Sequence, residues 1–205
     1  AKLIFVLGGP GAGKGTQCLR LIADYPNFVH LSAGDLLRKE RMSGSANGEL
    51  IQKCIDEGSI VPAEITIALI RQAMRDAGWT TKRFLIDGFP RNDDNYLAWF
   101  RLSPDVDVEY CLFLDCDPDK MVERIGMRGG TRSDDNPEIV KKRLVTYNEQ
   151  TRPIIERFEA QGKLLRVDVN GTPDEAYQNT IRGLGLTSPS SQSMKRSSGK
   201  CCIIE

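Results

Sequence analysis

The sequence predicts an α/β fold with a parallel sheet, organised around a glycine-rich loop that joins a strand to a helix. The apolar run at residues 3–7 is typical of a strand buried on both faces, as strands of parallel sheets are. Residues 17–22 carry the apolar spacing of a helix. The length of 205 residues suits one such domain with insertions, large enough to bury a substantial core.

The loop between these elements, Gly8-Gly9-Pro10-Gly11-Ala12-Gly13-Lys14-Gly15-Thr16, is predicted to bind phosphate. Backbone N–H groups converge where a tight turn opens a helix, and the positive end of the helix dipole lies behind them. The glycines let the main chain wrap a polyphosphate, and Lys14 supplies charge for its outer phosphates. A strict P-loop has Ser or Thr directly after its lysine, but Gly15 precedes Thr16 here, so we assign no metal to this hydroxyl. The alternative, a glycine-rich turn with a surface lysine, is disfavoured by the flanking strand and helix.

The composition argues against several classes of function. The 28 basic and 28 acidic residues balance, so no net field recruits nucleic acid or an anionic membrane to the protein. The six cysteines show no disulfide framework and no zinc spacing, and His30 is the single histidine, so we expect reduced thiols and no zinc. No apolar run approaches about 18 residues, and the pattern of a signal peptide is absent. We therefore expect a cytoplasmic protein without a membrane-spanning segment.

The second strand is expected at residues 28–31 and leads into a helix start at Ser32, with Arg38 further along the same helix. From about 34 to 77 the pattern is helical, with breaks at 43–45 and at 58–62. The middle piece between these breaks is a short amphipathic helix, which we interpret as part of a small inserted flap.

Asp87 closes the next apolar run, at 84–86, and is our candidate for holding magnesium through water. In nucleotide-binding α/β folds, a carboxylate at the end of the strand beside the P-loop commonly has this role. Asp115 closes the strand expected at 110–114 and is a rival for the same role. Mg²⁺ is the one cofactor that we expect.

Charged residues gather around a glycine-rich loop in the second half of the chain, which follows a helical pattern that begins near residue 118. They are Arg124, Arg128, Arg132, Asp134, Asp135 and, in the second turn of the next helix, Arg143. That helix is expected to run without interruption from Pro137 to about Ala160. Charged residues at such spacing usually face solvent. Beside a polyphosphate site, however, mobile arginines suit phosphoryl transfer, whose catalysis is mostly positioning and charge neutralisation.

The last strand is expected at 164–169 and a closing helix at about 173–184. Ser, Lys and Gly then dominate, and such a composition cannot bury apolar area, so we expect residues 185–205 to be disordered. The final residues fit the C-a-a-X frame at Cys202, with Cys201 beside it, but a terminal Glu lies outside the usual set. We expect a plain solvated tail, with a lipid tether at one of these cysteines as the alternative.

Four motifs together resemble those of the nucleoside monophosphate kinases in order and spacing. They are residues 8–16, 32–38, 87–91 and 132–136. The resemblance covers about residues 1–184 and implies one kinase domain of the P-loop three-layer type, with a five-stranded parallel sheet and helices on both faces. It also implies a helical monophosphate-binding flap at about 31–61, and a short lid at about 126–136 without the zinc-bearing insert of some bacterial relatives.

The resemblance also implies roles for single residues. For ATP binding it implies Gly9, Pro10, Gly11, Ala12, Gly13, Lys14, Gly15 and Thr16, together with Gly171 and with Arg124 stacked on the donor adenine. For the acceptor it implies Ala33, Arg38, Ile60, Val61, Gly88, Arg91 and Asn95, with the two arginines on the phosphate. The catalytic set would be Lys14, Arg128, Arg132 and Arg143. Asp87 would anchor hydrated magnesium, and Asp134 and Asp135 would latch the lid to the flap arginines.

Two positions bear on which monophosphate is the acceptor. Adenylate kinases of the family typically have Thr and Gln there, which read adenine, whereas this chain has Ala33 and Asn95. The shorter Asn amide suits a pyrimidine, because its donor and acceptor can pair with uracil or cytosine after an amide flip. Asn92, directly after Arg91, also resembles the UMP-CMP kinase branch. A surface asparagine on a helix is the alternative interpretation of Asn95.

The resemblance thus implies phosphoryl transfer from MgATP to UMP or CMP, with dCMP as a further acceptor to test, by a monomeric enzyme of pyrimidine nucleotide metabolism. The attacking oxygen belongs to an anionic phosphate, so no general base is required and His30 is interpreted as structural. Two rivals stay open: an adenylate kinase that uses AMP, and a nucleotide switch that hydrolyses or senses ATP. A switch would not need Arg38, Arg91 and a pocket that reads a base.

Overall fold

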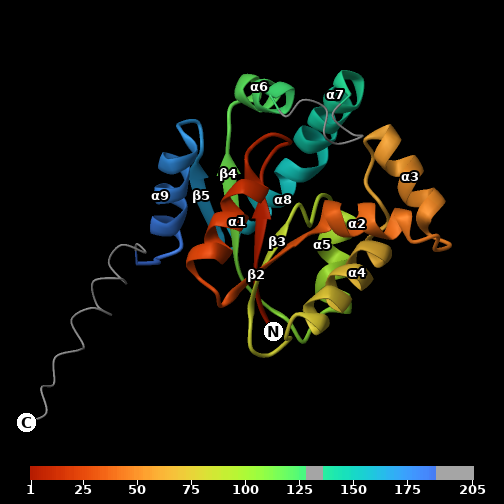
Figure 1. The fold of residues 1–205 in the computed structure, drawn as a ribbon, viewed down its shortest axis with the longest axis horizontal. Coiled ribbons are helices and arrows are strands. Elements are labelled where there is room, and N and C mark those ends of the chain that lie inside the picture. The colour runs from red at the N-terminus through yellow and green to blue at the C-terminus, as the bar shows by residue number, and fades with distance from the viewer. Residues whose placement is uncertain (128–135, 188–205) are drawn as a thin grey trace, which may run out of the picture.

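The computed structural model describes residues 1–127 and 136–187 and shows a sheet of five parallel strands with helices around it (Figure 1). The strand order is β2-β3-β1-β4-β5. The strands are β1 (Lys2–Leu7), β2 (Phe28–Ser32), β3 (Arg83–Asp87), β4 (Asp107–Asp115) and β5 (Leu164–Asp168). The predicted α/β fold with a parallel sheet is therefore confirmed.

Helices cover the sheet and extend beyond one end of it. They are α1 (Lys14–Asp24), α2 (Ala33–Met42), α3 (Gly48–Glu57), α4 (Ala63–Asp76), α5 (Asp93–Leu102), α6 (Pro118–Met127), α7 (Pro137–Thr146), α8 (Arg152–Ala160) and α9 (Pro173–Gly183). Helices α1 and α9 pack on each other and on the sheet, while α8 contacts β4 and β5 and α4 packs on α5. No helix within the described ranges is long and apolar enough to cross a membrane.

Strand β1 lies at the centre of the sheet and of the core. Its residues from Leu3 to Leu7 are at most 1% exposed, because neighbouring strands pair with both edges and helices cover both faces. The ring of Phe5 packs against Trp99 at a centroid distance of 5.4 Å and against Phe89 and Phe158 at 6.0 Å. An unbroken apolar run is what such a position requires, since no residue faces water.

A second, smaller apolar cluster lies apart from the main core. Leu37, Ile51, Cys54 and Val61 form it, from α2, from α3 and from the segment that leads into α4. Helices α2 and α3 pack on each other and extend away from the sheet at the end opposite α9 (Figure 1). A separate small core suits the helical flap that the sequence predicts.

The parallel arrangement brings three loops to the same edge of the sheet. In the register of the sheet, Asp87 at the end of β3 lies opposite both Val6 of β1 and Ser32 of β2. The loop after β1, the start of α2 and the loop after β3 therefore begin side by side. Ligands of open α/β sheets bind at this carboxyl edge.

The predicted long helix from Pro137 to about Ala160 is interrupted. Residues Tyr147–Thr151 form a π-turn between α7 and α8, in which the N–H of Arg152 bonds to the carbonyl oxygen of Tyr147 five residues back. Pro153 follows at the second position of α8; it has no N–H to donate, and its ring crowds the carbonyl four residues earlier. The apolar spacing predicted the helix, but the proline marks where its hydrogen bonding changes.

Strand β4 is longer than predicted, because only its second half is a continuous apolar run. Its first residues alternate between exposed and buried, and Lys2 pairs with Asp107 in the register with β1. The sequence criterion for a fully buried strand therefore found only the part from Tyr110 on. Disorder was predicted for residues 185–205, with a lipid at Cys201 or Cys202 as an alternative for the tail. Residues 188–205, including both cysteines, lie outside the described residues.

Candidate active site

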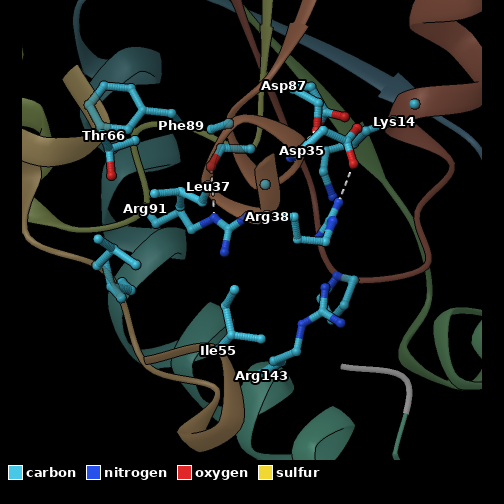
Figure 2. Close-up of a pocket in the computed structure, with 18 of the residues that line it drawn as sticks. Lys14, Asp35, Leu37, Arg38, Ile55, Thr66, Asp87, Phe89, Arg91 and Arg143 are labelled. Atoms are coloured by element: carbon cyan, nitrogen blue, oxygen red, sulfur yellow. Dashed lines mark hydrogen bonds and ion pairs between the residues drawn. The ribbon is translucent and has the colours of Figure 1, made fainter. Parts of the chain in front are cut away.

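A cavity of about 400 Å³ lies at the carboxyl edge of the sheet, where the loops after β1, β2 and β3 meet (Figure 2). Most residues predicted for the donor and the acceptor line it: Pro10, Gly11, Gly13, Lys14, Gly15, Thr16, Ala33, Arg38, Ile60, Val61, Asp87, Gly88, Arg91, Asn95 and Arg143. Residues from the P-loop, the flap, the loop after β3 and helix α7 thus share one cavity. Its extent suits a ligand, or a pair of ligands, with a phosphate at the P-loop and a base near α5.

The loop after β1 has backbone conformations that favour glycine. Gly11 has φ +87° and Gly13 has φ +85°, and a Cβ atom at Gly11 would overlap the carbonyl oxygen of Met121. Gly13 is also the N-cap of α1 and offers no capping side chain, so the N–H groups of the first turn are left for a ligand. Such donors at the positive end of a helix dipole bind anions.

Lys14 is the first residue of α1 and folds back over this loop. Its Nζ donates to the carbonyl oxygens of Gly8 at 2.9 Å and Gly9 at 3.0 Å. The pKa of Lys14 is lowered to about 8, chiefly because the ammonium is buried; Asp87 opposes this shift, while Arg91 and Arg143 add to it. The lysine charge is thus held at a cost that an anionic ligand would offset.

Three guanidinium groups reach the cavity from three different elements (Figure 2). Arg38 comes from α2 and is ion-paired with Asp35, Arg91 comes from the loop after β3, and Arg143 comes from α7. Together with Lys14 they give the lining four cationic side chains against two carboxylates, those of Asp35 and Asp87. A cavity with this balance suits a ligand that carries several negative charges.

Arg91 is held by the residues on either side of it. Its Nε donates to the carbonyl oxygen of Gly88 at 2.7 Å, and its backbone N–H donates to Asn95 Oδ1 at 3.2 Å. Gly88 has φ +77°, and a Cβ atom there would lie 3.0 Å from Arg91 Nη2. A side chain at residue 88 would therefore both strain the backbone and push the guanidinium away.

Asn95 is buried in the wall of the cavity, so its interpretation as a surface asparagine is wrong. The residue is 3% exposed, and Asn92 caps α5 by accepting the N–H of Asn95 at 2.9 Å. Because Asn95 Oδ1 accepts from Arg91, the orientation of the amide is fixed by its neighbour. The expected amide flip would break this contact, and Nδ2 is the atom that remains for a ligand.

Asp87 lies on the floor of the cavity beside the start of α1. It is 9% exposed, a Cβ atom at Gly15 would lie 3.9 Å from its Oδ2, and His30 Nε2 lies 3.5 Å from the same oxygen. Its rival Asp115 instead pairs with Arg166 at 3.0 Å and does not line the cavity. Among the described residues no group of three or more His, Cys, Asp or Glu could cage a metal. A single carboxylate beside a polyphosphate site fits magnesium held through water and phosphate oxygens.

Four predicted residues within the described ranges do not line the cavity. Gly9 and Ala12 support the P-loop from behind, where a Cβ atom at Gly9 would overlap Met121 Sδ. Arg124 donates to the carbonyl oxygens of Val169 at 2.9 Å and Gly171 at 3.1 Å. These contacts place Arg124 and Gly171 together at the loop between β5 and α9, and adenine stacking there stays a prediction. Arg128, Arg132, Asp134 and Asp135 lie outside the described residues.

The cavity is also lined by residues that sequence reasoning did not select as binding residues. They are His30, Leu37, Cys54, Ile55, Thr66 and Phe89, besides others of the flap. His30 was interpreted as structural, and its side chain lies in the wall beside Asp87. The position of His30 on β2, two residues before the strand end and next to β3, was the one signal that could have placed it near Asp87.

The comparison with protein families decides the family. A family model described as "Adenylate kinase" matches residues 6–163. The chain belongs to the adenylate kinase family. The match runs from β1 through the P-loop, the flap and the loop after β3 to the end of α8, so every described residue that lines the cavity lies within it. The family and the five-stranded parallel sheet agree with the resemblance drawn from the motifs.

Curated relatives cover most of the chain. A UMP-CMP kinase of Gallus gallus is 49% identical over 187 residues, which is 88% of this chain and 95% of that protein. A uridylate kinase of Saccharomyces cerevisiae is 52% identical over 182 residues, 87% of this chain and 88% of that protein. A UMP-CMP kinase of Danio rerio is 49% identical over 183 residues, with 86% and 93% covered.

Proposed function

We propose that this adenylate kinase family member transfers the γ-phosphoryl group of MgATP to UMP or CMP, giving ADP and UDP or CDP. One observation carries the proposal: a single cavity joins a P-loop to a second cationic site, Arg38 and Arg91, and to the buried amide of Asn95. The names of the relatives, UMP-CMP kinase and uridylate kinase, support the choice of acceptor at about half identity over most of the chain.

The donor phosphates bind at the P-loop in this proposal. The N–H groups of the loop and of the first turn of α1 face the β- and γ-phosphates, and Lys14 turns from its carbonyl partners toward them. Arg124 and Gly171 hold the adenine at the edge of the same site. Asp87 would hold Mg²⁺ through water, and the ion would supply positive charge to offset that of the phosphates.

The acceptor phosphate binds between Arg38 and Arg91. Arg143, with Arg128 and Arg132 of the lid at about 126–136, neutralises the group in transfer, and Asp134 and Asp135 latch this lid over the flap at about 31–61. The acceptor oxygen is already anionic and needs no general base. The residues instead have to hold two repelling phosphates in line and keep water out, because water would otherwise take the phosphoryl group.

Recognition of the base depends on Asn95 Nδ2. With Oδ1 engaged by Arg91, the amide offers a donor to the base. Uracil and cytosine share a ring carbonyl that accepts such a bond, so one fixed donor serves both bases. Ala33, Ile60 and Val61 line the cavity beside this amide and complete a small apolar surround.

A coupled assay of ADP formation tests the proposal. The purified protein is given MgATP with UMP, CMP, dCMP, AMP or water as the acceptor. We expect UMP and CMP to have the highest kcat/KM. A preference for AMP would instead assign an adenylate kinase and overturn the interpretation of Ala33 and Asn95, and equal ADP formation with water alone would assign a nucleotide switch.

The proposal includes a monomer in the cytoplasm that binds neither nucleic acid nor a membrane. The balanced charge of the chain supports it, since no net field favours a polyanionic partner. Sedimentation at micromolar concentration tests the monomer, and mass spectrometry of the protein from its native source tests whether Cys201 or Cys202 carries a lipid.

A further inference from the structure

The π-turn between α7 and α8 carries a threonine whose hydroxyl serves neither helix. Thr151 is the N-cap of α8, but its side chain makes no capping hydrogen bond. Its Oγ1 instead donates to the carbonyl oxygen of Arg91 at 2.8 Å, across 60 positions of sequence. The residue is 6% exposed, so this hydrogen bond is shielded from water. π-turns within helices occur frequently at functional sites.

Arg91 is thereby fixed at three points. Thr151 holds its carbonyl oxygen, Asn95 Oδ1 accepts its N–H, and the carbonyl oxygen of Gly88 accepts its Nε. Two of these contacts are local, within four residues of Arg91. The contact from Thr151 is the one of the three that ties Arg91 to a distant part of the fold, the π-turn that directly follows α7, the helix of Arg143.

The same turn also reaches the flap. Thr146, at the end of α7, donates its hydroxyl to the carbonyl oxygen of Gly58 at 3.3 Å. Gly58, Arg91, Arg143 and the two threonines line one small cavity of about 60 Å³ behind the P-loop. The π-turn therefore lies where the flap, the loop after β3 and helix α7 meet.

We propose that Thr151 is a positioning residue for Arg91, which sets the distance between the arginine on the acceptor phosphate and Arg143. The inference rests on the proposed function of Arg91. Transfer requires the two phosphates in line, and a displacement of about 1 Å at a reacting group can cost roughly 10²-fold in rate. Figure 2 shows Arg91 and Arg143 approaching the cavity from different sides, so their spacing depends on how the elements that carry them are joined.

The π-turn explains why this contact is available. Without the inserted residue, the side chain at 151 would point about 100° away around the helix axis, and its hydroxyl could then bond within its own helix, as that of Thr180 does to Ala176 at 2.8 Å. The extra residue of the π-turn and Pro153 after it give Thr151 an outward partner instead.

The test compares Thr151→Val, which keeps the shape but removes the hydroxyl, with Thr151→Ser, which keeps the hydroxyl. Thr180→Val is the matched control: Thr180 is fully buried, its hydroxyl also bonds a backbone carbonyl, and it lies on α9 away from the cavity. KM for the acceptor, KM for ATP, kcat and the melting temperature are measured for each, with the monophosphate that the wild type prefers.

We expect Thr151→Val to raise the acceptor KM about tenfold while the ATP KM stays within twofold, and Thr151→Ser to stay within about twofold of the wild type. Thr180→Val lowers the melting temperature without moving the acceptor KM. Equal acceptor KM values for Thr151→Val and the wild type overturn the inference, as does a serine variant as impaired as the valine variant. If the valine variant does not fold, Thr151→Ala replaces it, and the same comparison with serine decides.

The outcomes separate this inference from the proposed function. A wild type that prefers AMP removes the pyrimidine assignment, yet the Thr151 comparison is then made with AMP and still decides the positioning role. A wild type that uses UMP or CMP, with an acceptor KM that ignores Thr151, leaves the proposed function in place and removes the inference. A wild type that uses no monophosphate overturns both.

Discussion

Helices α1 and α9 occupy equivalent places in the fold, but their N-termini differ: that of α9 is capped by side chains and that of α1 is not. Each follows a strand of the same parallel sheet, β1 or β5, and starts at its carboxyl edge. The start of α9 is closed by its own side chains: Thr172 Oγ1 accepts the N–H of Glu175 at 3.2 Å, and Glu175 Oε2 accepts the N–H of Thr172 at 2.7 Å. The start of α1 has a glycine N-cap, no acidic residue in its first turn, and Lys14 as its first residue.

The difference shows that a helix start can be open to a ligand only if it lacks the stabilising hydrogen bonds of a side-chain cap. Orphan N–H groups and a positive dipole end are present at every helix start. At α9 a capping box satisfies the N–H groups of Thr172 and Glu175 within the chain, which stabilises the fold and removes two donors that an anion could otherwise use. At α1 a cation stands where the dipole favours an anion, so in the proposed function a phosphate supplies the partner that this helix start lacks. The absence of a capping side chain at a helix start is therefore a useful signal, because it indicates N–H groups that a ligand can bind.

The largest effect is expected from removing the cation at the open helix start. Lys14→Ala should lower kcat by roughly 10²-fold or more, because the charge that stabilises the transferring phosphates is lost. Steady-state kinetics with saturating MgATP and acceptor measure it. Lys82→Ala is the matched control, since Lys82 also donates to a backbone carbonyl, that of Pro26 at 3.0 Å, far from the cavity. An unchanged kcat in Lys14→Ala would remove the residue from the mechanism.

A second variant makes the start of α1 resemble that of α9. Thr16→Glu places a carboxylate at the third helical position, where Glu175 stands in α9. We expect the ATP KM to rise about tenfold or more through repulsion of the phosphates, while the free energy of unfolding stays equal or rises by about 0.3–1 kcal/mol through the helix dipole. Thr16→Gln, equal in size and uncharged, is the control. A glutamate variant that binds ATP as the glutamine variant does would contradict phosphate binding at this turn.

Local signals in the sequence were enough to predict the open helix start. The apolar run of β1, the glycines and Lys14 lie close together in the sequence. The conformation of each of these residues depends mainly on its neighbours along the chain. Asp87 was also predictable, because the end of a buried strand fixes which edge of the sheet a residue reaches. These parts of the site follow from secondary structure alone.

Contacts between distant segments could not be predicted in the same way. The burial of Asn95, the fixed orientation of its amide and the hydrogen bond from Thr151 to Arg91 depend on how α5 and the π-turn pack together. A helical pattern reports which face is apolar but not which partner a single polar group finds. Pro153 marks the π-turn, yet its consequence for Arg91 needs the fold.

A smaller effect is expected at the closed helix start. Thr172→Ala removes one half of the capping box and should lower the free energy of unfolding by about 1 kcal/mol, measured by urea denaturation. Because the side chain of Thr172 bonds only within the start of α9, and the adenine contacts proposed nearby involve Arg124 and Gly171 instead, kcat should stay within twofold of the wild type. Thr172→Ser retains the cap and is the control. A larger loss of activity than of stability would show that the loop before α9 contributes to transfer.

The smallest effect is expected from the titration of Lys14. At the two helix starts, Glu175 and Lys14 both have a lowered pKa, but for opposite reasons. The hydrogen bonds that Thr172 donates lower the pKa of Glu175, because a partner for the charged form is present. The pKa of Lys14 is lowered to about 8 chiefly by burial, because the buried ammonium loses its water and the carboxylate of Asp87 compensates for that loss only in part. The lowered pKa of Glu175 stabilises the fold at neutral pH. The lowered pKa of Lys14 leaves more than half of the Lys14 side chains neutral above about pH 8 when no anion is bound.

Binding of ATP should therefore be linked to proton uptake at Lys14. A phosphate beside the ammonium raises the pKa of Lys14 toward its ordinary range, so near pH 8.5 binding takes up a fraction of one proton, and near pH 6.5, where the lysine is already charged, this uptake vanishes. Calorimetry at each pH in two buffers of different ionisation enthalpy measures it. Lys14→Arg is the control, because its guanidinium stays charged at both pH values. Equal uptake in the arginine variant would assign the proton to another group.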